Sequence, residues 1–310
     1  MAYAVLFPGQ GSQFVGMGAD VFQARPDLVG DRADSFAGFS LRRLSLEGSE
    51  EELTRTEHAQ PALFALSYAL WDEFSRKAPA PSAAAGHSLG EYTALAAAGV
   101  FSYDVAMRIV AARGRAMAAA ADAEPSAMAA VIGSDLDAVE AVCAARRAEG
   151  GKLWVANINA PGQVVVAGGV DDVTWLGDAA SDLGLRRVME LAVAGAFHSP
   201  YMEPAADHLK AVLQGVDPAP PRFPVYSNVS AESVRGAEVI EALTAQVVSP
   251  VRFSDCLEAM AEAGIDTFVH VGPGDVTAGL VKRTVKDATV LTVSDLSGVA
   301  DAAEALSSMG

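Results

Sequence analysis

The hydrophobic residues of this chain fall either into short uninterrupted runs or into longer stretches with a helical repeat. Residues 3–7 are an apolar run that stops at a Pro-Gly turn, which predicts a short buried strand. Residues 48–77 repeat their apolar positions with a helical period, and residues 82–88 predict a second strand. That second strand is rich in alanine, a poor strand former, so it must depend on packing against its neighbours.

The pattern changes along the rest of the chain. Residues 91–99 and 102–121 predict two helices, the second with Ser102 as its N-cap. Residues 126–194 then follow the order strand, helix, strand, strand, helix, strand, which is the order of the ferredoxin-like motif. From residue 224 onward, strands (224–229, 267–273, 288–294) alternate with helices (237–248, 251–264, 276–286), which is typical of a parallel sheet.

These elements together predict an α/β fold with two lobes. We expect a large α/β-hydrolase-like catalytic lobe with a parallel sheet, formed by residues 1–125 and 195–310. A smaller ferredoxin-like lobe, residues 126–194, is inserted into it. A chain of 310 residues that is 51% hydrophobic can bury a core in both.

Composition and charge exclude several classes of protein. A formal net charge of −17 argues against nucleic-acid binding. No apolar run approaches the length of a bilayer span, and the apolar N-terminus lacks a basic leader, so neither a membrane protein nor a secretory signal is expected. The two cysteines are far apart and suit the cytoplasm, where we expect the protein to act. Without a Cys or H-E-x-x-H spacing, no metal is expected.

The segment Gly86-His87-Ser88-Leu89-Gly90 matches the G-x-S-x-G pattern of a nucleophile elbow. In such an elbow a turn between strand and helix lifts the serine hydroxyl above the sheet. The N–H of Leu89 would then point at an oxyanion. An ordinary Gly-Ser-Gly turn is the alternative.

A positively charged side chain is predicted on a buried helix face. Ile109, Arg113 and Met117 are spaced four residues apart and share one face, whereas Arg115 lies off that face and is expected to be solvated. A buried guanidinium requires an anionic partner, and its two parallel N–H groups fit a carboxylate. An internal ion pair with one of the many carboxylates is the alternative.

A base for Ser88 must come from a distant segment, and His198 lies at a strand-to-helix junction that suits this role. The other histidines compete for it; these are His58, His87, His208 and His270. Two glutamines are further candidates. Gln10 follows the first strand, at the edge where parallel sheets bind ligands, and Gln246 ends a helix, although either could only cap an element.

The motifs FPGQGSQ, GHSLGEYTALAAAG, RGRAM, NINAPGQVVVAGG, GAFHSPYM, VYSNVS, QVVSPVRF and VGPG occur in this order and span nearly the whole chain. The motifs and their order resemble those of the malonyl-CoA:acyl-carrier-protein transacylase family, which includes stand-alone acyltransferases of fatty acid and polyketide synthesis. The resemblance implies that Ser88 is the acylated nucleophile and that His198 is its base, oriented by a backbone carbonyl near Gln246. It also implies that Arg113 holds the malonyl carboxylate.

The resemblance assigns the remaining pocket residues as well. Gln10 and Leu89 would supply the oxyanion-hole N–H groups, and Gln246, Phe197 and Met117 would join Arg113 in the substrate pocket. In related acyltransferases a phenylalanine at the place of Phe197 accompanies plain malonyl, and a small serine accompanies methylmalonyl.

The implied reaction moves a malonyl group from CoA to the phosphopantetheine thiol of an acyl carrier protein, with malonyl-CoA as substrate and no cofactor. We expect the enzyme to act as a monomer. Two alternatives stay open: an acyl hydrolase that clears carrier-protein thioesters, and a scaffold that binds carrier proteins without turnover. The sequence does not distinguish fatty acid from polyketide synthesis.

Overall fold

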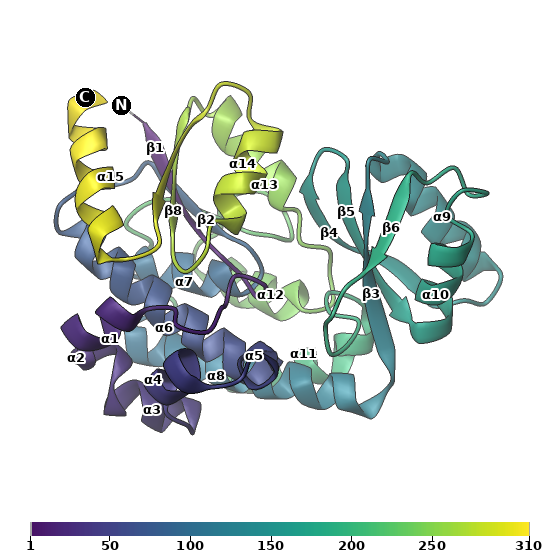
Figure 1. Cartoon of the computed structure of the whole chain (residues 1–310), viewed down its shortest axis with the longest axis horizontal. Coiled ribbons are helices and arrows are strands. Elements are labelled where there is room, and N and C mark those ends of the chain that lie inside the picture. Colours follow the sequence, from purple (N-terminus) through teal and green to yellow (C-terminus); the bar gives the residue numbers. More distant parts are fainter. Residues whose placement is uncertain (1, 310) are drawn as a thin grey trace.

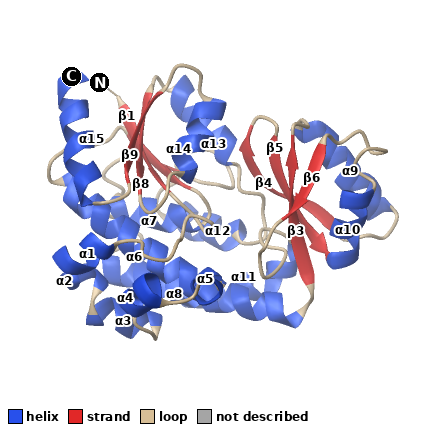
Figure 2. Ribbon diagram, viewed as in Figure 1, coloured by secondary structure: helices blue, strands red, loops and turns tan. Residues whose placement is uncertain are grey.

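The computed structural model describes residues 2–309 and arranges them in two lobes, each built around one β-sheet (Figures 1 and 2). The larger sheet has five strands in the order β7-β2-β1-β8-β9, all parallel where they pair. Its strands are β1 (Tyr3–Phe7), β2 (Ala83–Gly86), β7 (Val225–Tyr226), β8 (Thr267–Val271) and β9 (Thr289–Val293). The predicted parallel α/β sheet is confirmed.

The central strand β1 is buried on both faces, which explains its uninterrupted apolar run. Tyr3, Val5 and Phe7 face the main core, while Ala4 and Leu6 face a smaller core on the other side of the sheet. The alanine strand β2 is also fully buried, between β1 and β7, and so owes its form to tertiary packing as predicted.

Helices cover both faces of this sheet. The smaller core is closed by α13 (Phe253–Glu262) and α14 (Val276–Thr284). The main core is closed by the long helices α6 (Thr56–Ser75) and α8 (Tyr103–Ala123), together with α7 (Leu89–Ala97), α11 (Glu203–Leu213), α12 (Ala237–Gln246) and α15 (Leu296–Met309). Ser102 caps α8 as expected, because its hydroxyl accepts a hydrogen bond from the Val105 N–H.

Short helices complete the large lobe. Five of them lead from β1 to α6: α1 (Ala19–Ala24), α2 (Pro26–Val29), α3 (Asp31–Ala37), α4 (Leu41–Glu47) and α5 (Glu50–Thr54). A single 3₁₀ turn, η1 (Pro200–Met202), precedes α11. Figure 1 shows these N-terminal helices packed beside α6 and α8, away from the second sheet.

The second sheet is antiparallel, in the order β4-β5-β3-β6. Its chain order is β3 (Ser126–Ile132), α9 (Leu136–Ala148), β4 (Leu153–Ala160), β5 (Gln163–Gly169), α10 (Val170–Asp178) and β6 (Arg187–Glu190), all within the range expected for the small lobe. This is the ferredoxin-like arrangement. Both helices pack on one face of the sheet, while Met128 and Val165 on the other face belong to the main core.

Two strands end earlier than the hydrophobic pattern predicts. β6 stops at Glu190; the Leu191 N–H still donates to the carbonyl of Met128 in β3, and the chain leaves the sheet after it. β7 has only two residues, because the backbone after Tyr226 turns away and the Ser227 amide donates to the carbonyl of Glu232 instead of a strand partner. Both departures supply residues to the site described next.

Candidate active site

Ser88 sits at the sharp turn between β2 and α7 and adopts a left-handed backbone conformation, with φ 50° and ψ −103°. Such a conformation is strained for a residue other than glycine, and strain of this kind marks a nucleophile elbow. The flanking glycines permit the turn. A Cβ on Gly86 would lie 1.8 Å from the carbonyl carbon of Gly90, and a Cβ on Gly90 would lie 2.2 Å from the carbonyl oxygen of Phe7. The motif is therefore an elbow and not an ordinary turn.

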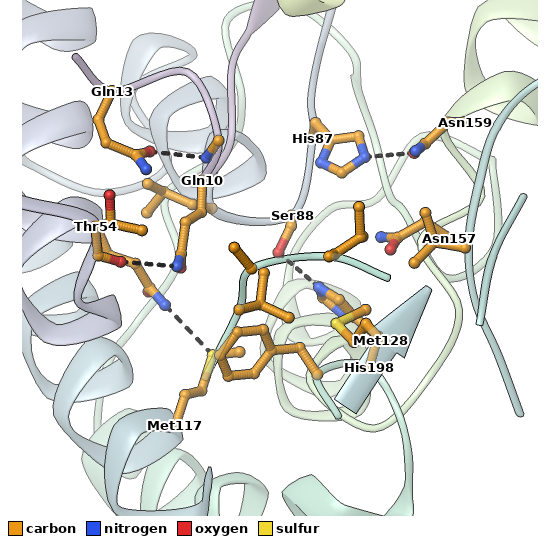
Figure 3. A pocket seen from close by; sticks show the side chains of 18 of the residues that line it. Gln10, Gln13, Thr54, His87, Ser88, Met117, Met128, Asn157, Asn159 and His198 are labelled. Carbon is orange, nitrogen blue, oxygen red and sulfur yellow. Dashed lines mark hydrogen bonds between the residues drawn. The ribbon is translucent and has the colours of Figure 1, made fainter. Parts of the chain in front are cut away.

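His198 meets Ser88 from a segment 110 residues further along the chain (Figure 3). Its Nδ1 lies 2.8 Å from the backbone carbonyl oxygen of Gln246, so Nδ1 carries the proton and donates it there. Nε2 is left as an acceptor, 2.8 Å from the Ser88 hydroxyl oxygen. Burial, and secondarily the charge of Arg113, lowers the pKa of His198 to about 3, which keeps the imidazole neutral.

None of the other histidines, all of them among the described residues, hydrogen-bonds to the Ser88 hydroxyl. His58 contacts the carbonyl of Glu52, His208 is exposed on α11, and the buried His270 contacts the Thr277 hydroxyl. His87 adjoins Ser88, yet its ring turns to Asn159, with 2.7 Å between Nε2 and Oδ1 (Figure 3).

Arg113 reaches the same hydroxyl from α8. Arg113 is 1% exposed, and its guanidinium donates to Gln60 Oε1 at 2.7 Å, Gln246 Oε1 at 2.9 Å and Ser88 Oγ at 3.0 Å. Within residues 2–309 it forms no ion pair, so the alternative of an internal salt bridge is wrong. Three neutral acceptors and the ring of Tyr92, 5.2 Å away, surround the cation.

A close approach of helices makes this placement of Arg113 feasible. Gly114 lies where α8 crosses α6, and a Cβ there would come within 3.1 Å of the Thr56 carbonyl oxygen. Arg115, the next arginine, is exposed as predicted.

Gln10 and Leu89 line the cavity beside Ser88, and the backbone N–H group of neither residue makes a hydrogen bond to another described residue. The two loops touch: a Cβ on Gly9 would lie 2.4 Å from the carbonyl oxygen of His87. The side chain of Gln10 points away from Ser88 and donates to the Thr54 carbonyl at 3.3 Å and the Thr56 hydroxyl at 3.2 Å (Figure 3).

Gln246 departs from the prediction, because its fully buried side chain does not line the cavity. It lies behind Arg113 and Ser88 instead. Its Oε1 accepts from Arg113, while its Nε2 donates to the Ser88 carbonyl at 2.9 Å and to Glu91 Oε2 at 2.6 Å. Gln246 therefore orients the other residues of the site through both its side chain and its backbone carbonyl.

Two residues of the site were not predicted. Asn228 is fully buried and brackets the elbow: its Oδ1 accepts from the Ser88 N–H at 2.7 Å, and its Nδ2 donates to the Gly86 carbonyl at 2.8 Å. Glu91 is fully buried beside it. The hydrophobic pattern placed Asn228 inside a strand, whereas β7 ends at Tyr226 and Asn228 follows two residues later, at the edge where parallel sheets bind ligands.

These side chains surround a cavity of about 320 Å³ between the lobes (Figure 3). The large lobe contributes Ser88, Arg113, Met117, Phe197 and His198 among others. The small lobe contributes Met128, Asn157, Asn159 and Val165, with Leu191, Ala192 and Val193 from the connection that follows β6. Phe197 and Met117 are thus in the cavity, as predicted.

Residues 2–309 contain neither a candidate metal cluster nor a candidate membrane-spanning helix. No group of three or more His, Cys, Asp or Glu side chains there could hold a metal ion. No helix in the same part of the chain is both long enough and apolar enough to span a membrane.

Comparisons with known proteins agree on one family. The sequence model of the acyl transferase domain family matches residues 5–305 of this chain. The malonyl CoA-acyl carrier protein transacylase of Bacillus subtilis (strain 168) is 42% identical over 295 residues, which cover 94% of this chain and 93% of the relative. The protein of the same name from Escherichia coli (strain K12) is 40% identical over 308 residues, which cover 97% and 99%.

Solved structures agree as well. An acyl-carrier-protein S-malonyltransferase from Bartonella henselae superposes with a TM-score of 0.93 at 36% identity, covering 99% of this chain and 100% of that one. A malonyl-transacylase solved in complex with its type II PKS acyl-carrier protein superposes with a TM-score of 0.92 at 39% identity, covering 98% and 100%.

Proposed function

The chain belongs to the acyl transferase domain family and, within it, to the malonyl CoA-acyl carrier protein transacylases, and we propose that it moves a malonyl group from CoA to a carrier-protein thiol through an ester on Ser88. One observation carries the proposal. The Ser88 hydroxyl oxygen lies 2.8 Å from His198 Nε2 and 3.0 Å from a buried guanidinium that has no carboxylate partner among residues 2–309.

The first half-reaction loads the enzyme. His198 Nε2 takes the proton of the Ser88 hydroxyl while Oγ attacks the thioester carbon of malonyl-CoA. The oxyanion that forms accepts hydrogen bonds from the backbone N–H groups of Gln10 and Leu89. Each such donor typically stabilises a transition state by about 3–4 kcal/mol. The carbon–sulfur bond then breaks, and the CoA sulfur takes the proton from His198.

The second half-reaction reverses these steps with a different thiol. The phosphopantetheine thiol of the carrier protein gives its proton to His198 and attacks the Ser88 ester. The ester bond breaks, and Ser88 Oγ regains the proton. No cofactor takes part, because the energy of the thioester is conserved through both transfers.

Arg113 selects the acyl group. A malonyl group presents a carboxylate to the guanidinium, whereas an acetyl group leaves the buried guanidinium without a carboxylate in contact, which costs several kcal/mol. A bound carboxylate also offsets the positive charge that contributes to the low pKa of His198, so the base becomes stronger when the correct substrate is present.

Intact-protein mass spectrometry after mixing with malonyl-CoA tests the proposal. We expect one malonyl adduct on the protein, none on Ser88→Ala, and the usual adduct on Ser308→Ala, a control at an exposed position of α15. An adduct on Ser88→Ala would contradict the nucleophile assignment.

The same measurement separates the alternatives. A hydrolase would lose the adduct to water at a rate that carrier protein does not change, and a scaffold would form no adduct. The transferase should keep its adduct until holo carrier protein is added. We expect the carboxylate-selective cavity to favour transfer, since Arg113 has no purpose for the uncharged acyl groups that such hydrolases remove.

A further inference from the structure

Glu91 is the third residue of α7, where a glutamate ordinarily accepts a hydrogen bond from the N–H of the N-cap residue. That N–H belongs to Ser88 and donates to Asn228 Oδ1 instead. The carboxylate of Glu91 turns into the core, where Oε2 accepts from Gln246 Nε2 at 2.6 Å and from the Asn228 N–H at 3.2 Å. Helix capping therefore does not explain this buried acid.

Gln246 connects Glu91 to Arg113. Each end of its side-chain amide hydrogen-bonds to one of the two charged groups. Oε1 accepts from Arg113 Nη2 at 2.9 Å, and Nε2 donates to Glu91. Charges that are separated by one amide in a buried site still attract each other, because little water screens them. Arg113 thus has an acidic group near it, though not in contact.

Both charged groups keep an unused polar atom. Glu91 Oε1 and Arg113 Nε are buried and have no hydrogen-bond partner among the described residues. Burial raises the pKa of Glu91 to about 7, so its charged and neutral forms have similar free energies near neutral pH. A proton on Oε1 would disturb neither hydrogen bond that Oε2 accepts.

We propose that Glu91 is the internal counter-charge of Arg113 and that it takes up one proton from solvent when a carboxylated acyl group occupies the cavity. The inference rests on the proposed function, since it takes Arg113 as the group that holds the carboxylate. A second carboxylate beside one guanidinium would leave an excess of negative charge in a buried site. Protonation of Glu91 at Oε1 removes that excess, so Glu91 is a positioning residue that tunes carboxylate affinity through Gln246.

The other titratable groups around Glu91 do not change charge between pH 6 and 8.5. Arg113 on α8 stays cationic. Burial raises the pKa of Tyr92, on the same helix, to about 12, and burial together with Glu91 raises that of Cys256 on α13. Burial lowers the pKa of His198 to about 3 and also lowers that of His87, next to Ser88, so both imidazoles are neutral in this range. A proton taken up in this pH range therefore belongs to Glu91.

Equilibrium binding of malonyl-CoA and acetyl-CoA to the Ser88→Ala protein, with and without Glu91→Gln, tests the inference between pH 6 and 8.5. With Glu91 present, the Kd of malonyl-CoA should rise about thirtyfold between pH 6 and 8.5 as the acid ionises, while that of acetyl-CoA stays level. Both ligands carry the same CoA phosphates, so their titration cancels. In Glu91→Gln, which keeps the size of the side chain but not its charge, the Kd of malonyl-CoA should stay at its low-pH value.

A rise that persists in Glu91→Gln would overturn the inference and leave the proposed function intact. Equal affinity for the two ligands at every pH would instead contradict the role of Arg113. Should Glu91→Gln fail to fold, calorimetry at pH 8 in two buffers of different ionisation enthalpy counts the protons that Ser88→Ala binds with malonyl-CoA. About one proton is expected for malonyl-CoA and none for acetyl-CoA. No uptake with malonyl-CoA overturns the inference.

Discussion

The wall of the cavity that the large lobe provides is polar and held by hydrogen bonds, whereas the wall that the small lobe provides is mostly apolar and held by packing. Ser88, His198 and Arg113 each make at least two hydrogen bonds to buried or half-buried partners. Met128 and Val165 lie on the open face of an antiparallel sheet and make only apolar contacts with the main core. One wall can thus perform chemistry, and the other, apart from the amides of Asn157 and Asn159, limits the size and shape of the acyl group.

This difference follows from the two sheets. The carboxyl ends of parallel strands converge at one edge, where Phe7 pairs with Gly86 and the loops that follow both strands touch. An antiparallel sheet presents a continuous face of side chains instead, which suits a cover. A polar link joins the walls at His87 and Asn159.

Arg113→Ala removes the cation of the polar wall and should have the largest effect on substrate selectivity. Loss of the cation should slow malonyl loading by about 10²- to 10³-fold, because truncation of a buried charge pair costs about 2–5 kcal/mol. Acetyl loading should stay level or improve. The matched control is Arg115→Ala, two residues along α8 and exposed. A parallel fall of the malonyl and acetyl rates would make Arg113 merely structural.

Phe197→Ser changes a residue at the border of the two walls. Phe197 is 6% exposed and lines the cavity next to His198, so its ring limits the room for an α-methyl group. A competition between malonyl-CoA and methylmalonyl-CoA should favour malonyl-CoA in the natural protein. The substitution should shift the ratio toward methylmalonyl by about tenfold to a few hundredfold. An unchanged ratio would show that the ring is only part of the core.

Asn228→Ala removes the two hydrogen bonds that hold the elbow, at a residue that does not line the cavity. Two buried hydrogen bonds are lost, each worth about 1 kcal/mol, and the strained Ser88 backbone gains freedom. The rate of malonyl loading should fall about tenfold while the KM for malonyl-CoA stays the same. A change confined to KM would mean that Asn228 acts on the substrate pocket.

Acid should affect the polar wall less than expected for a histidine base. For an ordinary imidazole with a pKa near 6.5, the fraction in the neutral, basic form would fall about 30-fold between pH 7 and 5. Because His198 has its pKa lowered to about 3, loading at saturating malonyl-CoA should change less than about threefold over this range. A 30-fold loss would show that the imidazole is not desolvated.

The same shift has a consequence for folding. The pKa of His198 is lower in the folded protein than in the unfolded chain, so acid protonates the unfolded chain first. The contribution of neutral His198 to the free energy of unfolding is therefore complete above pH 6.5 and falls as the pH drops toward 3. Urea unfolding of the protein and of His198→Gln across this range should show a shallower acid dependence in the variant.

Val165→Ala should have the smallest effect on catalysis. This side chain lies on the apolar wall, and its loss should cost roughly 1–2 kcal/mol of stability. Malonyl and acetyl loading should both change by less than about fivefold, and by the same factor. A selective loss of malonyl loading would mean that the small lobe also recognises the carboxylate.

Much of the fold and site could be predicted from local patterns. The elbow follows from Gly86, Ser88 and Gly90, because only glycine fits the two close contacts beside the turn. The ferredoxin-like order follows from the alternation of strand and helix patterns between residues 126 and 190. The buried face of α8 follows from the four-residue spacing of Ile109, Arg113 and Met117.

The partners of the site residues could not be predicted in this way. The sequence allowed an ion pair for Arg113, gave Gln246 a place in the pocket and gave no role to Asn228 or Glu91. Each of these depends on contacts between segments far apart in the chain: 133 residues separate Arg113 from Gln246, and 140 separate Ser88 from Asn228.

The sequence by itself predicted candidate residues for the chemistry and determined the local shapes that they adopt, because turns, caps and helix faces depend on neighbours within a few residues. The tertiary structure decided where β6 and β7 end, which carbonyl orients His198, and how Arg113 stays buried without an ion pair. Those outcomes depend on how distant segments share hydrogen bonds in a dry interior, and no local pattern encodes that sharing.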